Sequence, residues 1–384
     1  MDICVLNPFF YPYNGGTEKV LLEVYKRLAR KHNITVLSAV LYPGDKKQVE
    51  EIFGIRVVRL PSKYFNIPMM PLPFVQMKGL QDAIKRTRAD IYHINNRYQF
   101  FSNNVRAVRS VGGKVAITIH NSRPKNIGVF TDGAGFAFDV TSGRLLMSDA
   151  DLITGISRNT ITTTVPRRYH RKSHVVYNGV DFTRFCPRKE NSKMRSIRKQ
   201  LSLADNVILH NGRLVPQKGQ RYLMRAFSRF HMRRKDDYSL LIIGRGYLYD
   251  YLAELATKLD ITDRFQIISG ISEEDLPLYY NIASVFVMPS TYEPASVALL
   301  EGLSSGVPTI ASKVGGIPEM MKDGGIYVRP RKADDIERQL HNVFSGKVDV
   351  GEKINRGRKI IIKEHNWDDI AKEYERLFEE TVKR

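Results

Sequence analysis

The sequence predicts an α/β protein with two parallel-sheet domains. Its 384 residues exceed what a single hydrophobic core ordinarily holds, which favours two domains of about 180 residues each. Short, continuous apolar runs recur along the chain and are typical of strands buried on both faces of a parallel sheet. Segments with helical spacing separate them, which indicates repeated strand–helix–strand units. We expect the domains at residues 1–185 and 200–366, with a basic, serine-containing connection between them.

The clearest strand–helix–strand unit lies within residues 283–318. It consists of a strand, a loop, a helix and a second strand, at residues 285–288, 289–295, 296–303 and 307–311. Glu293 falls in the loop at the carboxyl end of the first strand, where open α/β sheets bind ligands. Glu301 follows about 12 Å further along the helix axis. The two carboxylates could therefore contact different parts of one elongated ligand, and the amides that begin the helix favour an anion.

Two other strands of the second half end in loops that carry cations or glycines. The run at 207–211 leads into Gly212-Arg213 and, further on, Lys218-Gly219. An arginine presents a planar fork to a diphosphate and a lysine adds a point charge, so this pair suits an anionic ligand. The run at 240–243 ends in Gly244-Arg245-Gly246, which allows close backbone approach to a ligand.

The first half begins with a strand at residues 2–7 and a helix at 17–28. Gly15-Gly16 between them permits a ligand to approach the start of the helix, although an ordinary turn explains the pair equally well. Further strands are expected at 33–38 and 55–60. Residues 64–74 are apolar but interrupted by prolines, which excludes a regular helix and leaves an acceptor wall, a membrane-touching loop or ordinary packing.

Two later strands of the first half end on polar side chains. The strand at 115–119 ends at His120, where an imidazole is well placed to contact a ligand. The strand at 153–157 ends on Ser157, before another helix. An isolated histidine or serine is, however, also common in purely structural roles.

The net charge is +20 and is unevenly distributed. Residues 1–181 contain 26 Lys and Arg against 13 Asp and Glu, a net charge of +13, and the rest of the chain carries +7. The first half therefore favours an anionic partner, such as a phosphorylated acceptor or an anionic membrane surface, unless the charge serves only solubility. Nucleic acid is not expected, because no zinc-finger, RNP or helix-turn-helix pattern accompanies the charge.

The remaining composition indicates a cytoplasmic protein. Cys4 and Cys186 are too few for a disulfide framework, and the sequence begins directly on a strand. No apolar run approaches the ~20 residues that span a bilayer, so membrane contact would be peripheral, at the inner face of the cell membrane.

The motif around Glu293 resembles the signature of retaining GT-B glycosyltransferases of the glycogen-synthase and phosphatidylinositol-mannosyltransferase type, called family four. The resemblance rests on Glu293, seven residues, Glu301, then Gly306-Val307-Pro308 and Gly315-Gly316. The Gly-Arg, four residues, Lys-Gly pattern at 212–219 and Asn-Gly-Val-Asp at 178–181 match the same family. The resemblance implies two Rossmann-like domains facing a cleft, with a C-terminal helix, residues 367–384, crossing back to the first. It also implies transfer of a hexose from a UDP- or GDP-sugar to a hydroxyl of a glycan, lipid-linked or phosphorylated acceptor.

The resemblance further implies roles for individual residues. Arg213 and Lys218 would stabilise the leaving nucleoside diphosphate, Glu301 would hold the ribose, and Glu293 and His120 would contact the transferred sugar. Residues that line the donor site by the same likeness are Gly15, Gly16, Ser157, Gly244, Arg245, Ile271, Ala295, Ser296 and Val297. Ala295-Ser296 departs from the Phe-Gly or Phe-Ser of many relatives, which bears on the fit around the donor sugar.

No metal or other cofactor is expected. Asp149-Ala150-Asp151 matches the Asp-x-Asp metal motif of another glycosyltransferase fold, but here it precedes a strand instead of following one. The same Ala-Asp or Ala-Ser pair precedes the strands at 91 and 285, so we interpret it as a strand-start feature. The rival hypotheses are a phosphorylase or epimerase of the same fold, and a basic nucleotide-sugar- or membrane-binding protein without turnover.

Overall fold

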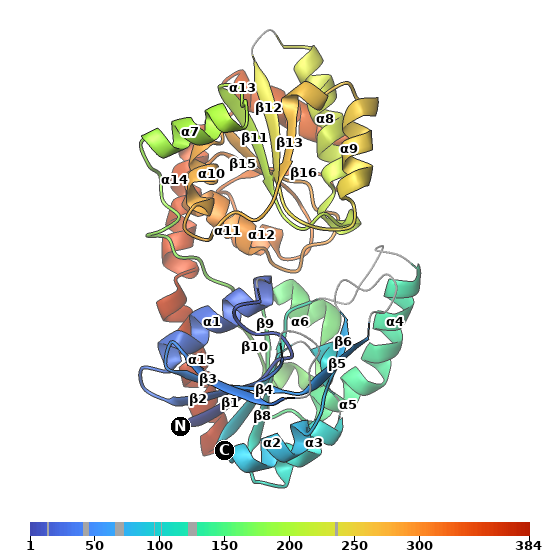
Figure 1. Cartoon of the computed structure of the whole chain (residues 1–384), viewed down its shortest axis with the longest axis vertical. Helices are drawn as coiled ribbons and strands as arrows, with labels where there is room; N and C mark the ends of the chain where they lie inside the picture. Colours follow the sequence, from blue (N-terminus) through green and yellow to red (C-terminus); the bar gives the residue numbers. More distant parts are fainter. Residues whose placement is uncertain are drawn as a thin grey trace. The chain divides into compact units, whose positions relative to one another are not determined.

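The computed structural model describes residues 1–13, 15–40, 46–65, 73–95, 97–100, 102–121, 129–234 and 237–384. The chain divides into two units (Figure 1). The first comprises Met1–Asn178 together with Trp367–Arg384, and the second comprises Gly179–Asn366. Most of the apolar stretch expected at 64–74 lies outside the described residues.

The boundary between the units follows Asn178, earlier than the expected residue 185. Val180 already belongs to the second unit, where its N–H donates to the carbonyl of His365 at 2.9 Å. Phe185 is fully buried there, with its ring 5.8 Å from that of Tyr280. The expected connection also contains a helix of this unit, α7 (Ser192–Gln200).

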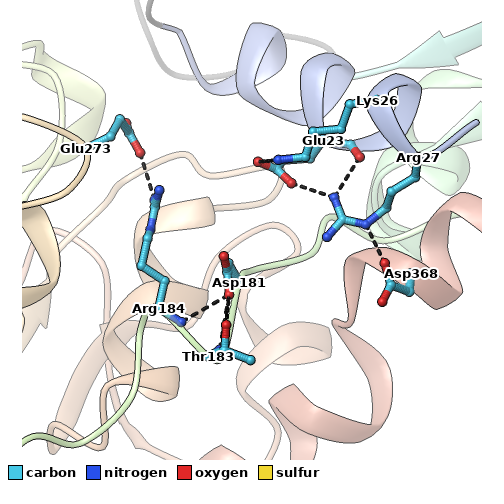
Figure 2. A network of polar contacts seen from close by, with 8 residues as sticks. All are labelled: Glu23, Lys26, Arg27, Asp181, Thr183, Arg184, Glu273 and Asp368. Carbon is cyan, nitrogen blue, oxygen red and sulfur yellow. Dashed lines mark hydrogen bonds and ion pairs between the residues drawn. The ribbon is translucent and has the colours of Figure 1, made fainter. Parts of the chain in front are cut away.

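Asp181 ends the Asn-Gly-Val-Asp motif and organises the turn that follows it (Figure 2). Its Oδ1 accepts from the backbone N–H groups of Thr183 and Arg184, at 3.1 and 3.0 Å. Arg184 in turn forms an ion pair with Glu273 at 2.8 Å. The motif is therefore a capped turn at the start of the second unit.

The first unit contains an eight-stranded sheet with strand order β10-β9-β8-β7-β1-β2-β4-β3. All neighbouring strands are parallel except β3, which pairs antiparallel with β4. The strands are β1 (Asp2–Leu6), β2 (Asn33–Ala39), β3 (Gln48–Ile52), β4 (Ile55–Leu60), β7 (Ile91–Ile94), β8 (Lys114–Ile119), β9 (Leu152–Gly155) and β10 (Ser173–Val175). A separate antiparallel pair is formed by β5 (Ser62–Phe65) and β6 (Phe74–Met77). β3 and this pair were not expected, because their short runs are largely polar or exposed.

Helices cover both faces of this sheet (Figure 1). Because successive side chains of a strand point to opposite faces, Tyr92 donates to the carbonyl of Ile84 in α2, whereas His93 contacts Tyr25 in α1. The helices are α1 (Gly16–Leu28), α2 (Leu80–Thr87), α3 (Ser102–Arg109), α4 (Val129–Val140), α5 (Ser142–Asp149), α6 (Arg158–Thr164) and α15 (Trp367–Lys383). Short 3₁₀ segments are η1 (Arg97–Gln99) and η2 (Arg167–Lys172).

The C-terminal helix α15 belongs to the first unit, as the sequence predicts. It packs along α1 and buries its apolar stripe, which includes Trp367, Tyr374 and Phe378. At its start Asp368 accepts from Nε of Arg27 at 2.6 Å, and Arg27 also pairs with Glu23 (Figure 2). Among the described residues, no helix is long and apolar enough to cross a membrane.

The second unit contains a fully parallel six-stranded sheet with strand order β13-β12-β11-β14-β15-β16. Chain order reverses between β11 and β14, which makes their junction the topological switch point, where such sheets bind ligands. The strands are β11 (Asn206–Asn211), β12 (Tyr238–Ile243), β13 (Phe265–Ile268), β14 (Val285–Met288), β15 (Thr309–Ser312) and β16 (Ile326–Val328).

This sheet separates two hydrophobic cores. Ile208 and Leu240 contribute to one, and the next residues, Leu209 and Leu241, to the other. The helices around it are α8 (Gln220–Met232), α9 (Tyr249–Lys258), α10 (Leu276–Ile282), α11 (Val297–Ser304), α12 (Ile317–Met321), α13 (Ala333–Phe344) and α14 (Val350–Glu364), with the 3₁₀ segments η3 (Pro216–Lys218) and η4 (Thr262–Arg264).

The repeated Ala-Asp and Ala-Ser pairs do precede strands, and they serve one purpose. Asp90 accepts from the N–H of Asp2, Asp151 from that of Val115, and Ser284 from that of Val207, at 2.8, 2.7 and 3.2 Å. Each donor begins the neighbouring strand and has no ladder partner before it. The side chain therefore completes the hydrogen bonding at the strand's start.

Candidate functional site

The loops that follow β11 and β14 are fastened together at the switch point of the second unit. The N–H of Thr291 donates to the carbonyl of Gln217 at 2.8 Å. Gly219 has φ +71°, and a Cβ added to it would lie only 2.1 Å from the carbonyl oxygen of Pro289. Any other residue at 219 would separate the two loops, which explains why the Lys-Gly motif requires this glycine.

Lys218 and Glu293 meet across this junction. Nζ of Lys218 lies 2.5 Å from Oε2 of Glu293, which also accepts from the hydroxyl of Ser290 at 3.1 Å. Both side chains are largely buried, with 17% and 7% of their surface exposed. The structure thus brings together two of the residues that the sequence singled out, 75 positions apart.

Gly315-Gly316 fixes the backbone of Glu293. The N–H of Gly316 donates to the carbonyl of Glu293 at 3.0 Å. Gly315 has φ +53°, and a Cβ there would lie 2.0 Å from the same carbonyl oxygen. The glycine turn therefore acts by close backbone packing against the acidic residue.

Arg213 and Arg245 lie side by side beyond the ends of β11 and β12. The strands pair Asn211 with Ile243, and the ladder continues through Leu214, whose N–H donates to the carbonyl of Arg245 at 2.8 Å. In-register residues of parallel strands are about 4.8 Å apart and project to the same face. Both arginines are exposed, and neither side chain forms a hydrogen bond or ion pair with any residue in the described part of the chain.

Gly244 and Gly246 allow this close pairing. An added Cβ on Gly244 would lie 2.0 Å from the carbonyl oxygen of Gly212, and one on Gly246 would lie 2.3 Å from that of Leu214. The Gly-x-Gly pattern, expected to allow a ligand near the backbone, is thus required by the neighbouring loop. The result is a pair of adjacent, uncompensated guanidinium groups.

Glu301 lies on α11 and is held by Tyr280. The hydroxyl of Tyr280 donates to Oε2 of Glu301 at 3.0 Å and accepts from Nδ2 of Asn211 at 2.9 Å. Burial, followed by the nearby Glu301 carboxylate, raises the pKa of Tyr280 well above its ordinary value. The phenol therefore remains a donor, and it ties the helix to the end of β11.

The other predicted donor-site residues of this unit surround these groups. Ser296 is the N-cap of α11, and its hydroxyl accepts from the N–H of Leu299 at 3.3 Å. Its side chain thus serves the helix instead of pointing outward. Ala295, Val297 and Ile271 are half-buried, in the loop and first turn before Glu301 and in the loop after β13.

The remaining predicted residues belong to the first unit. Gly15 and Gly16 form the start of α1, and a Cβ on Gly15 would lie 2.0 Å from Oε2 of Glu18, whereas Gly16 has open space. Ser157 is fully buried and caps α6, accepting from the N–H of Thr160 at 3.1 Å. His120 follows β8, is 8% exposed, and contacts Asn95.

Several residues that shape the site were not expected from the sequence. Ser290, Tyr280 and Asn95 each contact a predicted residue through a side chain distant from the family motifs. Ser290 could have been found from its position three residues before Glu293. Tyr280 and Asn95 carried no signal, because tertiary packing alone brings them to their partners.

One group in the described residues has the composition of a metal site. Ligand atoms of His32, Glu375 and Glu379 lie within 4.8 Å of one another in the first unit. Nε2 of His32 is already 2.9 Å from Oε1 of Glu375, which also pairs with Lys31 at 3.4 Å. These ion pairs account for the group as a contact between α15 and the loop after α1.

Two parallel-sheet α/β units with this arrangement define the GT-B glycosyltransferase fold. A UDP complex of Anabaena Alr3699/HepE superimposes with a TM-score of 0.78 over 99% of this chain and 100% of that one, at 17% identity. Sucrose-phosphate synthase from Thermosynechococcus elongatus gives a TM-score of 0.75 over 98% of each chain, at 18% identity.

Family models and relatives identify the family itself. The model described as glycosyl transferases group 1 matches residues 193–359, and that described as glycosyltransferase family 4 matches residues 14–184. The chain therefore belongs to this glycosyltransferase family.

Individual relatives carry related names. A Methanocaldococcus jannaschii protein named uncharacterized glycosyltransferase MJ1607 is 32% identical over 53% of this chain, which spans about half, 52%, of that relative. The GDP-mannose-dependent alpha-(1-6)-phosphatidylinositol monomannoside mannosyltransferase of Mycolicibacterium smegmatis is 29% identical, over 82% of this chain and 81% of its own. One of the human proteins named for phosphatidylinositol N-acetylglucosaminyltransferase is 23% identical, over 98% of this chain and 76% of its own.

Proposed function

We propose that this protein transfers a hexose, such as glucose or mannose, from a UDP- or GDP-sugar to an acceptor hydroxyl with retention of anomeric configuration. The observation that carries the proposal is the polar group at the switch point of the second unit. There Lys218 is paired with Glu293, while Arg213 and Arg245 lie nearby without counter-charges. Such a group matches a ligand that combines a diphosphate with a sugar.

The cations would stabilise the leaving nucleoside diphosphate. Charge develops on the departing phosphate, and fixed donors aimed at it supply a large share of the rate enhancement of such reactions. Two in-register guanidinium groups repel each other when empty, and a diphosphate between them would remove that repulsion while accepting paired hydrogen bonds. We assign Arg213 and Arg245 to the diphosphate, with Lys218 as the adjoining point charge.

The carboxylates would orient the rest of the donor. Glu301, rigidly held by Tyr280, suits the ribose hydroxyls, and Glu293 suits the sugar. The amides that begin α11 lie between them and favour the phosphates. Names of relatives support this donor class: one is GDP-mannose-dependent, and the Anabaena structure was solved with UDP and with UDP-glucose.

Retention would proceed by a front-face reaction, in which the leaving phosphate helps to take the acceptor's proton. Glu293 is already bound to Lys218 and Ser290, which suits an orienting role better than that of a covalent nucleophile. A sugar trapped on Glu293 or another side chain would overturn this mechanism. We also propose that the three cations replace a divalent metal, so that transfer would continue in EDTA.

The acceptor would be a lipid-linked or phosphorylated molecule at the inner face of the cell membrane. Two relatives are named for phosphatidylinositol-based substrates, and residues 1–181 carry a charge of +13. Flotation with liposomes tests this: binding to phosphatidylglycerol-containing vesicles at low salt, but not to phosphatidylcholine vesicles, is expected. Equal recovery with both vesicles would argue for a soluble acceptor.

The decisive test is thermal stabilisation by UDP, GDP, ADP and their sugars. A ligand that binds only the folded state raises the melting temperature. We expect one diphosphate nucleotide to do so, and Arg213→Ala to abolish the shift, which would also name the base. Absence of a shift with every nucleotide, together with absence of sugar release or transfer, would refute the proposed donor site.

A further inference from the structure

Asn95 and His120 form a buried pair at the ends of two adjacent strands of the first unit. Asn95 follows β7 and has no exposed surface, and His120 follows β8 and is 8% exposed. Nε2 of His120 lies 2.8 Å from Oδ1 of Asn95. β7 and β8 are parallel neighbours, so the pair is fixed by the sheet and not by a loop.

The environment of Asn95 determines which end of its amide faces the histidine. Nδ2 of Asn95 lies 3.5 Å from the carbonyl oxygen of His93, a group that can only accept hydrogen bonds. The reversed amide would place two oxygens against each other there. Oδ1 therefore faces His120.

This orientation determines the tautomer of His120. An amide oxygen only accepts, so Nε2 of the ring must carry the hydrogen. Burial lowers the pKa of His120 to about 4, which leaves the ring neutral at pH 7 with a single N–H group. Its other nitrogen, Nδ1, is then an acceptor, and no residue in the described ranges hydrogen-bonds to it.

We propose that Asn95 is a positioning residue that locks His120 in the Nε2–H tautomer, so that Nδ1 accepts a hydrogen bond from a hydroxyl group of the substrate. A lone-pair nitrogen attracts a hydroxyl hydrogen and repels phosphate or carboxylate oxygens. The pair therefore selects a sugar or polyol hydroxyl and rejects an anionic group at this position. Only the assignment of that hydroxyl to a substrate rests on the proposed glycosyltransferase function; the tautomer does not.

Nitrogen NMR tests the tautomer directly, on the full chain labelled with ¹⁵N-histidine and without ligand. The His120 signals are identified as those missing from His120→Gln. We expect an unprotonated Nδ1 and a protonated Nε2 in the wild type. Asn95→Asp, which still offers an acceptor oxygen, should keep this pattern, whereas Asn95→Leu should lose it. A protonated Nδ1 or a mixture of tautomers in the wild type would overturn the proposal, whether or not Asn95→Leu folds.

Kinetics with the donor identified by thermal stabilisation test the role in substrate recognition. Asn95→Ala should lower kcat/KM at least tenfold, while Asn103→Ala, an exposed asparagine on α3, should leave it unchanged. Asn95→Asp should retain most of the activity, because it preserves the tautomer. Equal kcat/KM values for the two alanine variants would refute the positioning role. If no donor is found, the proposed function fails while the NMR result still decides the tautomer.

Discussion

Nζ of Lys218 lies 2.5 Å from Oε2 of Glu293, so the cation that follows β11 neutralises the carboxylate that follows β14. The pair spans the point at which chain order reverses in the sheet of the second unit. In the absence of ligand each residue compensates the charge of the other. A bound diphosphate would compete for the lysine and a sugar for the carboxylate, so the pair is prepared for exchange.

Breaking this pair from one side should destabilise the second unit. Lys218→Met leaves a buried carboxylate without its cation and should cost about 3 kcal/mol, near the lower limit for buried pairs because the lysine is partly exposed. Glu293→Gln should cost less, since a neutral amide needs no counter-charge. Denaturant unfolding of both variants and of the double variant measures this. The double variant should lose less than the sum, and strictly additive losses would contradict the coupling.

The two unpaired arginines should contribute to diphosphate binding. Arg213→Ala and Arg245→Ala should each weaken binding of the preferred nucleoside diphosphate by about 10- to 100-fold, the value of one or two charge-assisted hydrogen bonds. Arg225→Ala is the matched control, because it removes the same charge from an exposed position on α8. Titration calorimetry at two salt concentrations should show a weaker salt dependence for the first two variants only. Affinity that is unchanged in Arg245→Ala would remove this residue from the site.

Removing the hydroxyl of Tyr280 should loosen Glu301. In Tyr280→Phe the carboxylate loses its donor and Nδ2 of Asn211 loses its acceptor. The free energy of unfolding should fall by about 1–3 kcal/mol, the cost of a buried unpaired group. Nucleoside binding should weaken more than binding of inorganic pyrophosphate, because the ribose contact is the one disturbed. Equal weakening of both ligands would argue against the ribose role of Glu301.

Acidification should destabilise the second unit through His210. Desolvation by burial, opposed by a hydrogen bond to Val287 and assisted by Lys218, lowers the pKa of His210 to about 4. The unfolded residue has a pKa of about 6.5 and binds its proton first, so the stability that the neutral ring contributes is complete above pH 6.5. It is lost as the pH falls towards 4, by about 3 kcal/mol in total. His210→Asn, whose amide can still donate to Val287, should show a flatter dependence of unfolding free energy on pH between 4 and 6.5. Parallel curves would contradict the shift.

Substitution of Gly315 should disturb Glu293 from behind. A methyl group there would meet the carbonyl oxygen of Glu293 at 2.0 Å, in a backbone conformation with φ +53°. Gly315→Ala should therefore lower the melting temperature and the donor affinity together. Gly133→Ala is the control, because its added methyl has no neighbour within 4 Å and lies in α4. Similar behaviour of the two variants would show that the glycine turn is not needed to place the acidic residue.

Much of the second unit could be predicted because its strands are short apolar runs that end in recognisable loops. The helix at 333–344 was predicted to the residue, and the strands at 207–211 and 240–243 to within two. The first unit was predicted less completely. β3 is almost wholly exposed, so its sequence lacks the apolar pattern on which strand prediction depends.

The sequence by itself determined the two α/β units, the family, and the order of Arg213, Lys218, Glu293 and Glu301 along the chain, because apolar periodicity and motif spacing are local properties. Tertiary structure alone decided which side chains are paired and which are free. Lys218 is neutralised by Glu293, whereas Arg213 and Arg245 are adjacent and uncompensated, and Asn95 faces His120 across two strands. Those relationships depend on strand order and register, which bring residues distant in sequence within hydrogen-bonding distance and which no local pattern encodes.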